Sequence, residues 1–190
     1  DVSESRGLGD VYKRQIKSFS DVCKVTFRES DSYDVDKRNI LFGSVDMSFW
    51  GMAGLVGRAN FPDGSKDSGL TTMVSDWFKP HLNSLPNVYG PGSWLYAVAM
   101  HELGHSMGLA HPHHAMSGGT FPGVTNGISS MLGDNSLNSG PFTVMTYNFT
   151  NAGPYTPGMQ NAATHPATCG CPTCLGAFDI AHLQLSLIHI

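Results

Sequence analysis

One short segment of this chain restricts its fold more than any other: His101-Glu102-Leu103-Gly104-His105-Ser106-Met107-Gly108-Leu109-Ala110-His111. Residues four apart on a helix lie one turn above another on the same face, so His101 and His105 would project together. Gly108 can adopt a positive φ, which would turn the chain sharply out of the helix and bring His111 back toward the same point. The segment therefore predicts a helix ending near Gly108 and a cluster of imidazoles at its side.

A cluster of this kind is typical of a catalytic zinc site. Neutral imidazoles bind Zn²⁺ at ~2.0–2.1 Å, and three protein ligands leave a fourth position open for water. Glu102 would lie beside the metal rather than on it, where its carboxylate can take a proton from the attacking water. We predict that His101, His105 and His111 bind zinc and that Glu102 is the general base. The alternative is a helix whose histidines are merely satisfied in the core or on the surface.

Two further histidines adjoin the third predicted ligand. His113 and His114 could bind the metal only if the turn had a different register, because His111 already has the required spacing. We therefore expect both side chains to face solvent.

Composition disfavours several classes of function. The chain has 190 residues, with 15 acidic against 11 basic side chains and a net charge of −4. This balance argues against a nucleic-acid partner or an anionic membrane surface. No apolar run approaches the ~20 residues that a membrane-spanning helix needs. The length fits one domain with a buried core, and the 22 glycines and 14% charged residues are typical of a loop-rich extracellular enzyme.

The two ends of the chain share an unexpected relation. Residues 10–15, Asp-Val-Tyr-Lys-Arg-Gln, can be encoded by GATGTGTATAAGAGACAG, whose reverse complement encodes residues 185–190, Leu-Ser-Leu-Ile-His-Ile. One DNA element in opposite orientations, resembling a transposon end used in sequencing libraries, would explain both. We interpret residues 1–15 and 185–190 as adapter-derived, and residues 16–184 as a catalytic domain truncated at both ends.

Periodicity and turn residues predict most strands before most helices. Segments rich in β-formers and bounded by turn residues predict strands at 22–28, 39–43, 54–61 and 71–78. Helical spacing and capping residues predict the end of one helix at 16–21 and further helices at 94–107, after the cap Ser93, and 177–184. Residues 112–141, rich in Gly, Ser, Asn and Pro, predict a long surface loop. Because strands and helices do not alternate, we expect an α+β domain.

The segment from His101 to His111 resembles the long zinc-binding motif of the metzincin proteases. Pro112 directly after it, and the sequence from Leu137 to Asn148, are similar to the serralysin branch of that group. The resemblance implies that Met145 forms the methionine turn, an apolar floor beneath the metal. It also implies that Tyr147 is a displaceable fifth zinc ligand that can steady the tetrahedral intermediate.

The rest of the chain agrees with a metzincin-type zincin domain, which implies a mixed twisted sheet and an active-site helix. Residues 175–184 resemble the helix that closes the serralysin protease domain, and residues 54–61 would supply the edge strand that pairs with an extended substrate. Matrixins usually place the methionine turn closer behind the third histidine than Met145 stands in this chain. Astacin-like members typically have an acidic residue in place of Pro112, so the serralysin branch fits better.

The resemblance implies a secreted zinc endopeptidase of broad specificity that acts on proteins or peptides. We expect a monomer with no nucleic-acid partner and no membrane span, and calcium bound in Gly-rich repeats that would follow the domain. The alternative is a catalytically silent zinc-binding or adhesive domain of the same fold. The presence of Glu102 argues against this alternative, because a domain that only binds metal needs no general base.

Four cysteines depart from the serralysin pattern: Cys23, Cys169, Cys171 and Cys174. For a secreted enzyme we favour two disulfides, with free thiols as one alternative. A second zinc site that includes His165 or Cys23 is the other alternative.

Overall fold

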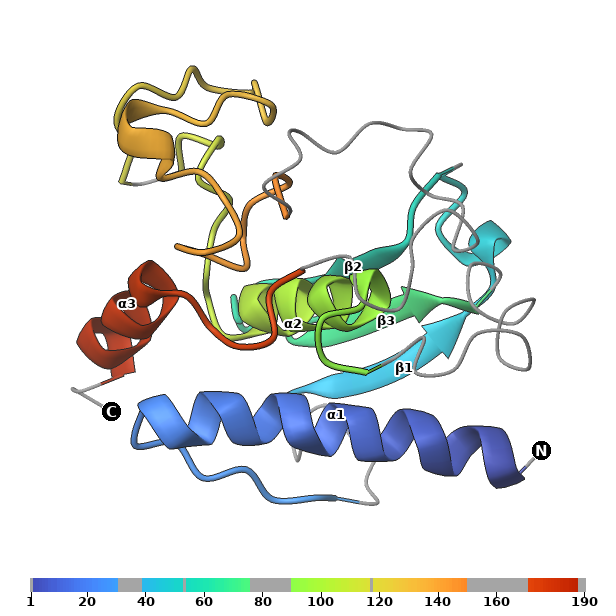
Figure 1. The fold of residues 1–190 in the computed structure, drawn as a ribbon. Coiled ribbons are helices and arrows are strands. Elements are labelled where there is room, and N and C mark those ends of the chain that lie inside the picture. Colours follow the sequence, from blue (N-terminus) through green and yellow to red (C-terminus); the bar gives the residue numbers. More distant parts are fainter. Residues whose placement is uncertain are drawn as a thin grey trace.

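The computed structural model describes residues 2–30, 39–52, 54–75, 90–116, 118–149 and 171–187, arranged as Figure 1 shows. In chain order the elements are α1 (Val2–Val22), β1 (Leu41–Val45), the 3₁₀ turn η2 (Met47–Phe49), β2 (Gly57–Ala59), β3 (Leu70–Val74), α2 (Trp94–Ser106), the 3₁₀ turn η5 (Asp134–Ser136) and α3 (Ala177–Leu187). The α+β class predicted from the sequence is confirmed.

The described strands form one sheet in the order β1-β3-β2. β1 runs parallel to β3, with Leu41 opposite Leu70 and Val45 opposite Val74. β2 runs antiparallel to β3, with Gly57 opposite Met73. The sheet is therefore mixed, as predicted, and β2 lies at one edge of its described part.

Helix α2 lies at the centre of the molecule, and every residue from Trp94 to Ser106 is buried. The Ser93 hydroxyl caps its start by accepting from the Tyr96 N–H at 3.2 Å. One apolar cluster packs α2 against β3 and includes Met73, and another packs it against α1, α3 and the chain around Met145. A helix that is apolar on all sides is a buried helix, so its functional side chains project from a rigid frame.

Helix α1 continues through residues 2–15, which we interpreted as adapter-derived. The Tyr12 ring packs on Phe42 of β1 with 3.7 Å between centroids, and Gln15 Nε2 donates to the Tyr96 carbonyl at 3.0 Å. The Tyr12 hydroxyl and Gln15 Oε1 are nevertheless buried with no hydrogen-bond partner in the described part of the chain. Buried polar atoms are nearly always paired, so the polar groups of this helix complement the core poorly.

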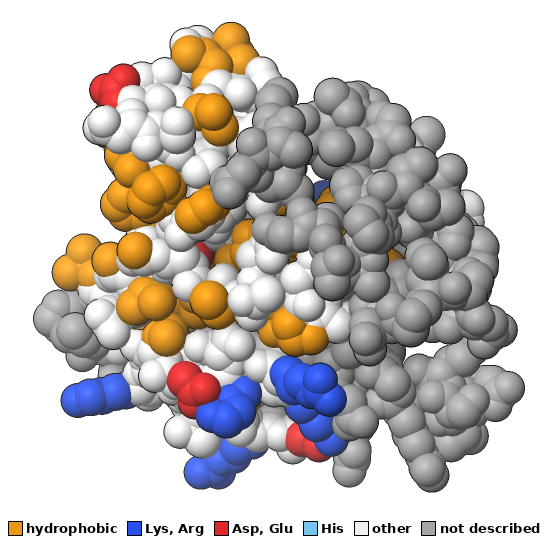
Figure 2. Space-filling model, in the orientation of Figure 1, with side chains coloured by type: hydrophobic (Ala, Val, Ile, Leu, Met, Phe, Trp, Pro, Cys, Tyr) orange, Lys and Arg blue, Asp and Glu red, His pale blue; other side chains and the backbone are white. Residues whose placement is uncertain are grey.

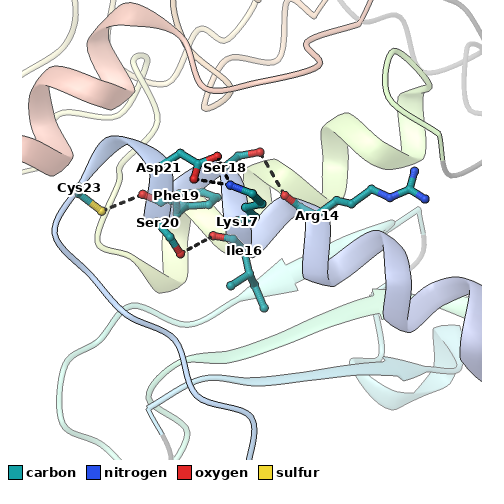
Figure 3. A network of polar contacts seen from close by, with 8 residues as sticks. All are labelled: Arg14, Ile16, Lys17, Ser18, Phe19, Ser20, Asp21 and Cys23. Atoms are coloured by element: carbon teal, nitrogen blue, oxygen red, sulfur yellow. Dashed lines mark hydrogen bonds and ion pairs between the residues drawn. The ribbon is translucent and has the colours of Figure 1, made fainter.

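The C-terminal end of α1 carries local polar contacts, some exposed and some buried (Figure 3). Lys17 Nζ lies 2.8 Å from one carboxylate oxygen of Asp21, and Cys23 Sγ donates to the Phe19 carbonyl at 3.0 Å. Figure 2 shows basic side chains gathered over this part of the molecule. Exposed ion pairs of this kind stabilise little, so the fully buried Phe19 is what fastens α1 to the core.

One predicted strand is wrong. Residues 25–30 have no regular structure, and Val22 ends α1. Val25 and Phe27 still pack against the core, which explains the alternating pattern without a pairing strand. The other three strands are confirmed as β1, β2 and β3, although residues 76–78 lie outside the described residues.

The predicted helices and the long loop are also found. Helix α2 and helix α3 lie where expected, and α3 continues to Leu187. The described residues of 112–141 are irregular apart from η5 and one isolated antiparallel bridge between Met116 and Gly119. This loop with α3 carries many of the hydrophobic side chains on the face shown in Figure 2. Val124 and Asn138 of the loop are buried, so part of it packs as core rather than only covering the surface.

Candidate metal centre

Three imidazole nitrogens converge beside α2. His111 Nε2 lies 2.9 Å from the Nε2 atoms of both His101 and His105. The other nitrogen of each of the two imidazoles on α2 contacts the main chain. His101 Nδ1 lies 2.8 Å from the Val144 carbonyl oxygen, and His105 Nδ1 lies 2.8 Å from the Leu109 carbonyl oxygen. A carbonyl only accepts, so both Nδ1 atoms carry the proton and both Nε2 lone pairs face the common point.

This arrangement fits a bound cation. Burial lowers the pKa of His101 well below its ordinary value and the pKa of His105 to about 4. Burial and the neighbouring imidazoles also lower the pKa of His111 well below its ordinary value. All three rings are therefore neutral at neutral pH, which is the form that binds a metal. Converging lone pairs repel one another unless a cation lies between them, and three neutral imidazoles suit Zn²⁺.

The chain leaves α2 as the sequence predicts. Gly108 has a φ of +93°, in the left-handed region that favours glycine. The Leu109 N–H then donates to the Gly104 carbonyl at 2.9 Å, and the carbonyl of Leu109 receives the His105 Nδ1–H. The turn that returns His111 to the site thus also orients His105.

Glu102 leaves α2 on the side that faces β2. A Cβ added to Gly57 would lie 2.7 Å from Glu102 Cγ, so the approach of strand and carboxylate requires a glycine there. Desolvation raises the pKa of Glu102 to about 8, against the opposing effects of a hydrogen bond from the Ala59 backbone and the charge of Arg58. A cation at the histidines would oppose this rise. The carboxylate is thus buried beside the imidazoles and suited to exchanging a proton near neutral pH.

Met145 and Tyr147 both lie next to the histidines. A Cβ added to Gly104 would meet Met145 Sδ at 2.5 Å, so the thioether packs directly on α2 between the turns that carry His101 and His105. The Tyr147 ring lies 5.6 Å from that of His101, centroid to centroid. Desolvation, and then the Glu102 charge, raise the pKa of Tyr147 to about 12.

Sequence reasoning missed Asp179, a buried acid on α3. One carboxylate oxygen accepts from the Thr143 hydroxyl at 2.6 Å, and the other accepts from the N–H groups of Val144 and Gly176, each at 2.8 Å. Val144 in turn receives the Nδ1–H of His101 on its carbonyl. Asp179 therefore fixes the main chain that orients the first histidine. Its only sequence signal is its place in the first turn of a helix, which indicates a helix start and not a remote partner.

The expectation that His113 faces solvent is wrong. Its side chain is 2% exposed, and its ring stacks on that of His111 with 4.8 Å between centroids. His114 is exposed, as expected.

The expectation of two disulfides is also wrong. Cys171 is disulfide-bonded, whereas Cys23 is a buried free thiol and Cys174 an exposed one. Cys169 and His165 lie outside the described residues. The disulfide at Cys171 also removes one thiolate from the alternative zinc site.

A protein-family model agrees with the geometry. The model for the matrixin peptidases (Peptidase_M10) matches residues 4–117, which is more than half of the chain and includes the three converging histidines and Glu102. The chain belongs to this family of metallopeptidases, so zinc is the metal implied at the histidine cluster.

Two curated relatives define the branch more closely. The chain is similar to Serralysin of Photorhabdus laumondii, with 32% identity over 104 residues that cover 53% of this chain and 19% of that protein. It is also similar to Metalloprotease AprA of Pseudomonas entomophila, with 30% identity over 167 residues that cover 78% of this chain and 32% of that protein. The chain thus spans about a third or less of the length of these relatives. These matches confirm the resemblance to a serralysin-like metzincin catalytic domain that the sequence predicted.

The matrixin match ends before Met145. The distance from His111 to Met145, which distinguishes matrixins from serralysins, therefore lies partly outside the matched residues.

Among the described helices, none combines the length and apolar character needed to cross a membrane.

Proposed function

We propose that this chain is the catalytic domain of a secreted zinc endopeptidase that cuts peptide bonds in proteins. The observation that carries the proposal is the convergence of the Nε2 atoms of His101, His105 and His111 with the carboxylate of Glu102 buried beside them. Bound there, zinc would polarise the scissile carbonyl and lower the pKa of water.

Glu102 performs the proton transfers in this proposal. Its carboxylate takes a proton from the attacking water and returns it to the leaving amine. The contacts with Gly57 and the Ala59 backbone support the role, because they hold a flexible side chain in one place. Positioning of this kind is what lets a general base act on one particular water.

Tyr147 and Met145 take supporting roles. Tyr147 would be a further ligand to the zinc, and its hydroxyl would donate to the oxyanion of the tetrahedral intermediate. Its raised pKa supports the second role, since the hydroxyl stays protonated and can donate at neutral pH. Met145 forms the apolar floor, and its packing against Gly104 keeps water away from the underside of the histidines.

The substrate would bind as an added strand. β2 lies at the edge of the described sheet, next to Glu102, and offers backbone groups to an extended peptide. Backbone pairing is independent of sequence, which supports broad specificity toward unfolded proteins.

We also propose that residues 16–184 act as a monomeric extracellular domain and that residues 1–15 and 185–190 are adapter-derived. The unpaired buried atoms of Tyr12 and Gln15 support a foreign origin for the first segment, whereas the family match that begins at residue 4 counts against it. We further propose that the whole protein binds calcium in Gly-rich repeats of the serralysin kind.

Replacing Glu102 tests the function. Glu102→Ala and Glu102→Gln should both keep about one zinc per chain by elemental analysis. Both should cleave an unfolded protein that carries a fluorescent label ~10²–10⁴-fold more slowly than the parent chain. The exposed Glu29, far from the histidines in sequence, gives the matched control, and Glu29→Gln should cleave at the parent rate. The proposal fails if zinc-loaded parent protein leaves this substrate intact under conditions where a reference metalloprotease cuts it.

A further inference from the structure

A second group of imidazole nitrogens lies on the other side of the His111 ring. His111 Nε2 faces the site described above, while His111 Nδ1 lies 3.1 Å from His114 Nδ1. One ligand atom each from His111, His113 and His114 lies within 4.8 Å of the others. The third predicted zinc ligand therefore presents one nitrogen to each of two clusters.

His113 gives the second cluster a buried member. Its ring stacks on His111 at 13° between planes and contacts the His114 ring with 4.5 Å between centroids. His113 Nδ1 is buried and has no hydrogen-bond partner among the described residues. A buried imidazole nitrogen without a partner is uncommon, so this nitrogen is free to accept a ligand.

We propose that His111, His113 and His114 form a second transition-metal site that shares His111 with the first. The cluster consists of nitrogen donors without a carboxylate, so it suits Zn²⁺, Cu²⁺ or Ni²⁺ rather than Ca²⁺ or Mg²⁺. When both sites are filled, His111 bridges the two ions through Nε2 and Nδ1 as an imidazolate and gives its ring proton to water.

Sharing a ligand makes the two sites unequal. Binding of the second ion requires loss of the remaining His111 ring proton and brings two cations to one ring, and both effects weaken it. Zinc should therefore fill the first site at stoichiometric concentration and the second only in excess. Metal binding at this second site does not depend on whether the chain cleaves peptides.

Equilibrium dialysis against rising free zinc, with bound zinc counted by atomic absorption, tests the proposal. The parent chain should bind one zinc tightly and a further equivalent at least ~10-fold more weakly. His114→Asn should lose the weak equivalent and keep the tight one. His182→Asn, at an exposed histidine of α3 outside both clusters, should keep both.

His114 is exposed, so its replacement should leave the thermal unfolding midpoint of the zinc-free protein unchanged. His113→Asn should also lose the weak equivalent, and the midpoint reports separately whether that buried change disturbs folding. A parent chain that binds no further zinc, or a weak equivalent that persists in His114→Asn, would overturn the proposal.

Discussion

Replacement of Asp179 by alanine should destabilise the protein and weaken zinc binding together. The substitution leaves the buried N–H groups of Val144 and Gly176 without an acceptor, while the Thr143 hydroxyl can turn elsewhere. Each buried unsatisfied group costs about 1–3 kcal/mol. Burial also raises the pKa of Asp179, so removal of the carboxylate recovers part of its desolvation penalty. The expected net loss is about 3 kcal/mol, a large part of the ~5–15 kcal/mol by which domains are stable.

The effect on zinc follows from the link through Val144. Its N–H is held by Asp179 and its carbonyl receives the Nδ1–H of His101, so a looser main chain leaves that ring less well oriented. Loss of a group that orients a metal ligand typically weakens the metal ~10–100-fold.

Urea unfolding of the zinc-free protein, followed by circular dichroism, measures the first effect, and competition with a chelator of known affinity measures the second. Asp179→Asn is the control, because its amide oxygen can still accept from both N–H groups while its NH₂ donates to Thr143. It should lose only about 1 kcal/mol. The reasoning is refuted if Asp179→Ala loses less than about 1 kcal/mol and keeps the parent zinc affinity.

Two further substitutions test the packing around α2 and α1. Gly104→Ala should destabilise the protein by about 1–3 kcal/mol in urea unfolding, because the added Cβ would lie 2.5 Å from Met145 Sδ. Replacing glycine by alanine within a helix normally stabilises it by about 1 kcal/mol, so a gain in stability would contradict this packing. Tyr12→Phe should raise the free energy of unfolding by about 1 kcal/mol, because it removes a buried hydroxyl with no partner in the described chain. The hydroxyl of Tyr96 is hydrogen-bonded to Ser18, so Tyr96→Phe should lower the free energy of unfolding instead. Equal losses of stability in the two variants would count against the foreign origin of the first segment.

The sequence predicted the features that depend on short spacings. The cap at Ser93, the spacing of His101 and His105 and the positive φ of Gly108 are all local, and each is found in the structure. The family resemblance predicted a role for Met145 beneath the metal, which periodicity alone could not suggest. In the structure Met145 packs against Gly104 of α2.

The features that the sequence did not predict depend on remote contacts. Asp179 acts on Val144, 35 positions earlier in the chain, and no local pattern reports such a pairing. His113 is buried because the rings of His111 and Tyr147 cover it, which depends on how two separate loops fold together. The segment 22–28 shows the opposite failure, since alternate side chains that pack on a core resemble a strand even where no neighbouring strand pairs with them.

The carbonyl acceptors of Val144 and Leu109 have a consequence for the entropy of metal binding. Each fixes one histidine ring through Nδ1, so the rotamers of His101 and His105 are selected when the chain folds and not when an ion arrives. Ordering a buried side chain costs up to ~2 kcal/mol of conformational entropy, and in this site that cost falls on folding. Ions can then exchange without rearranging these ligands, so the rate of exchange should be set by the dehydration of the ion and not by motion of the chain.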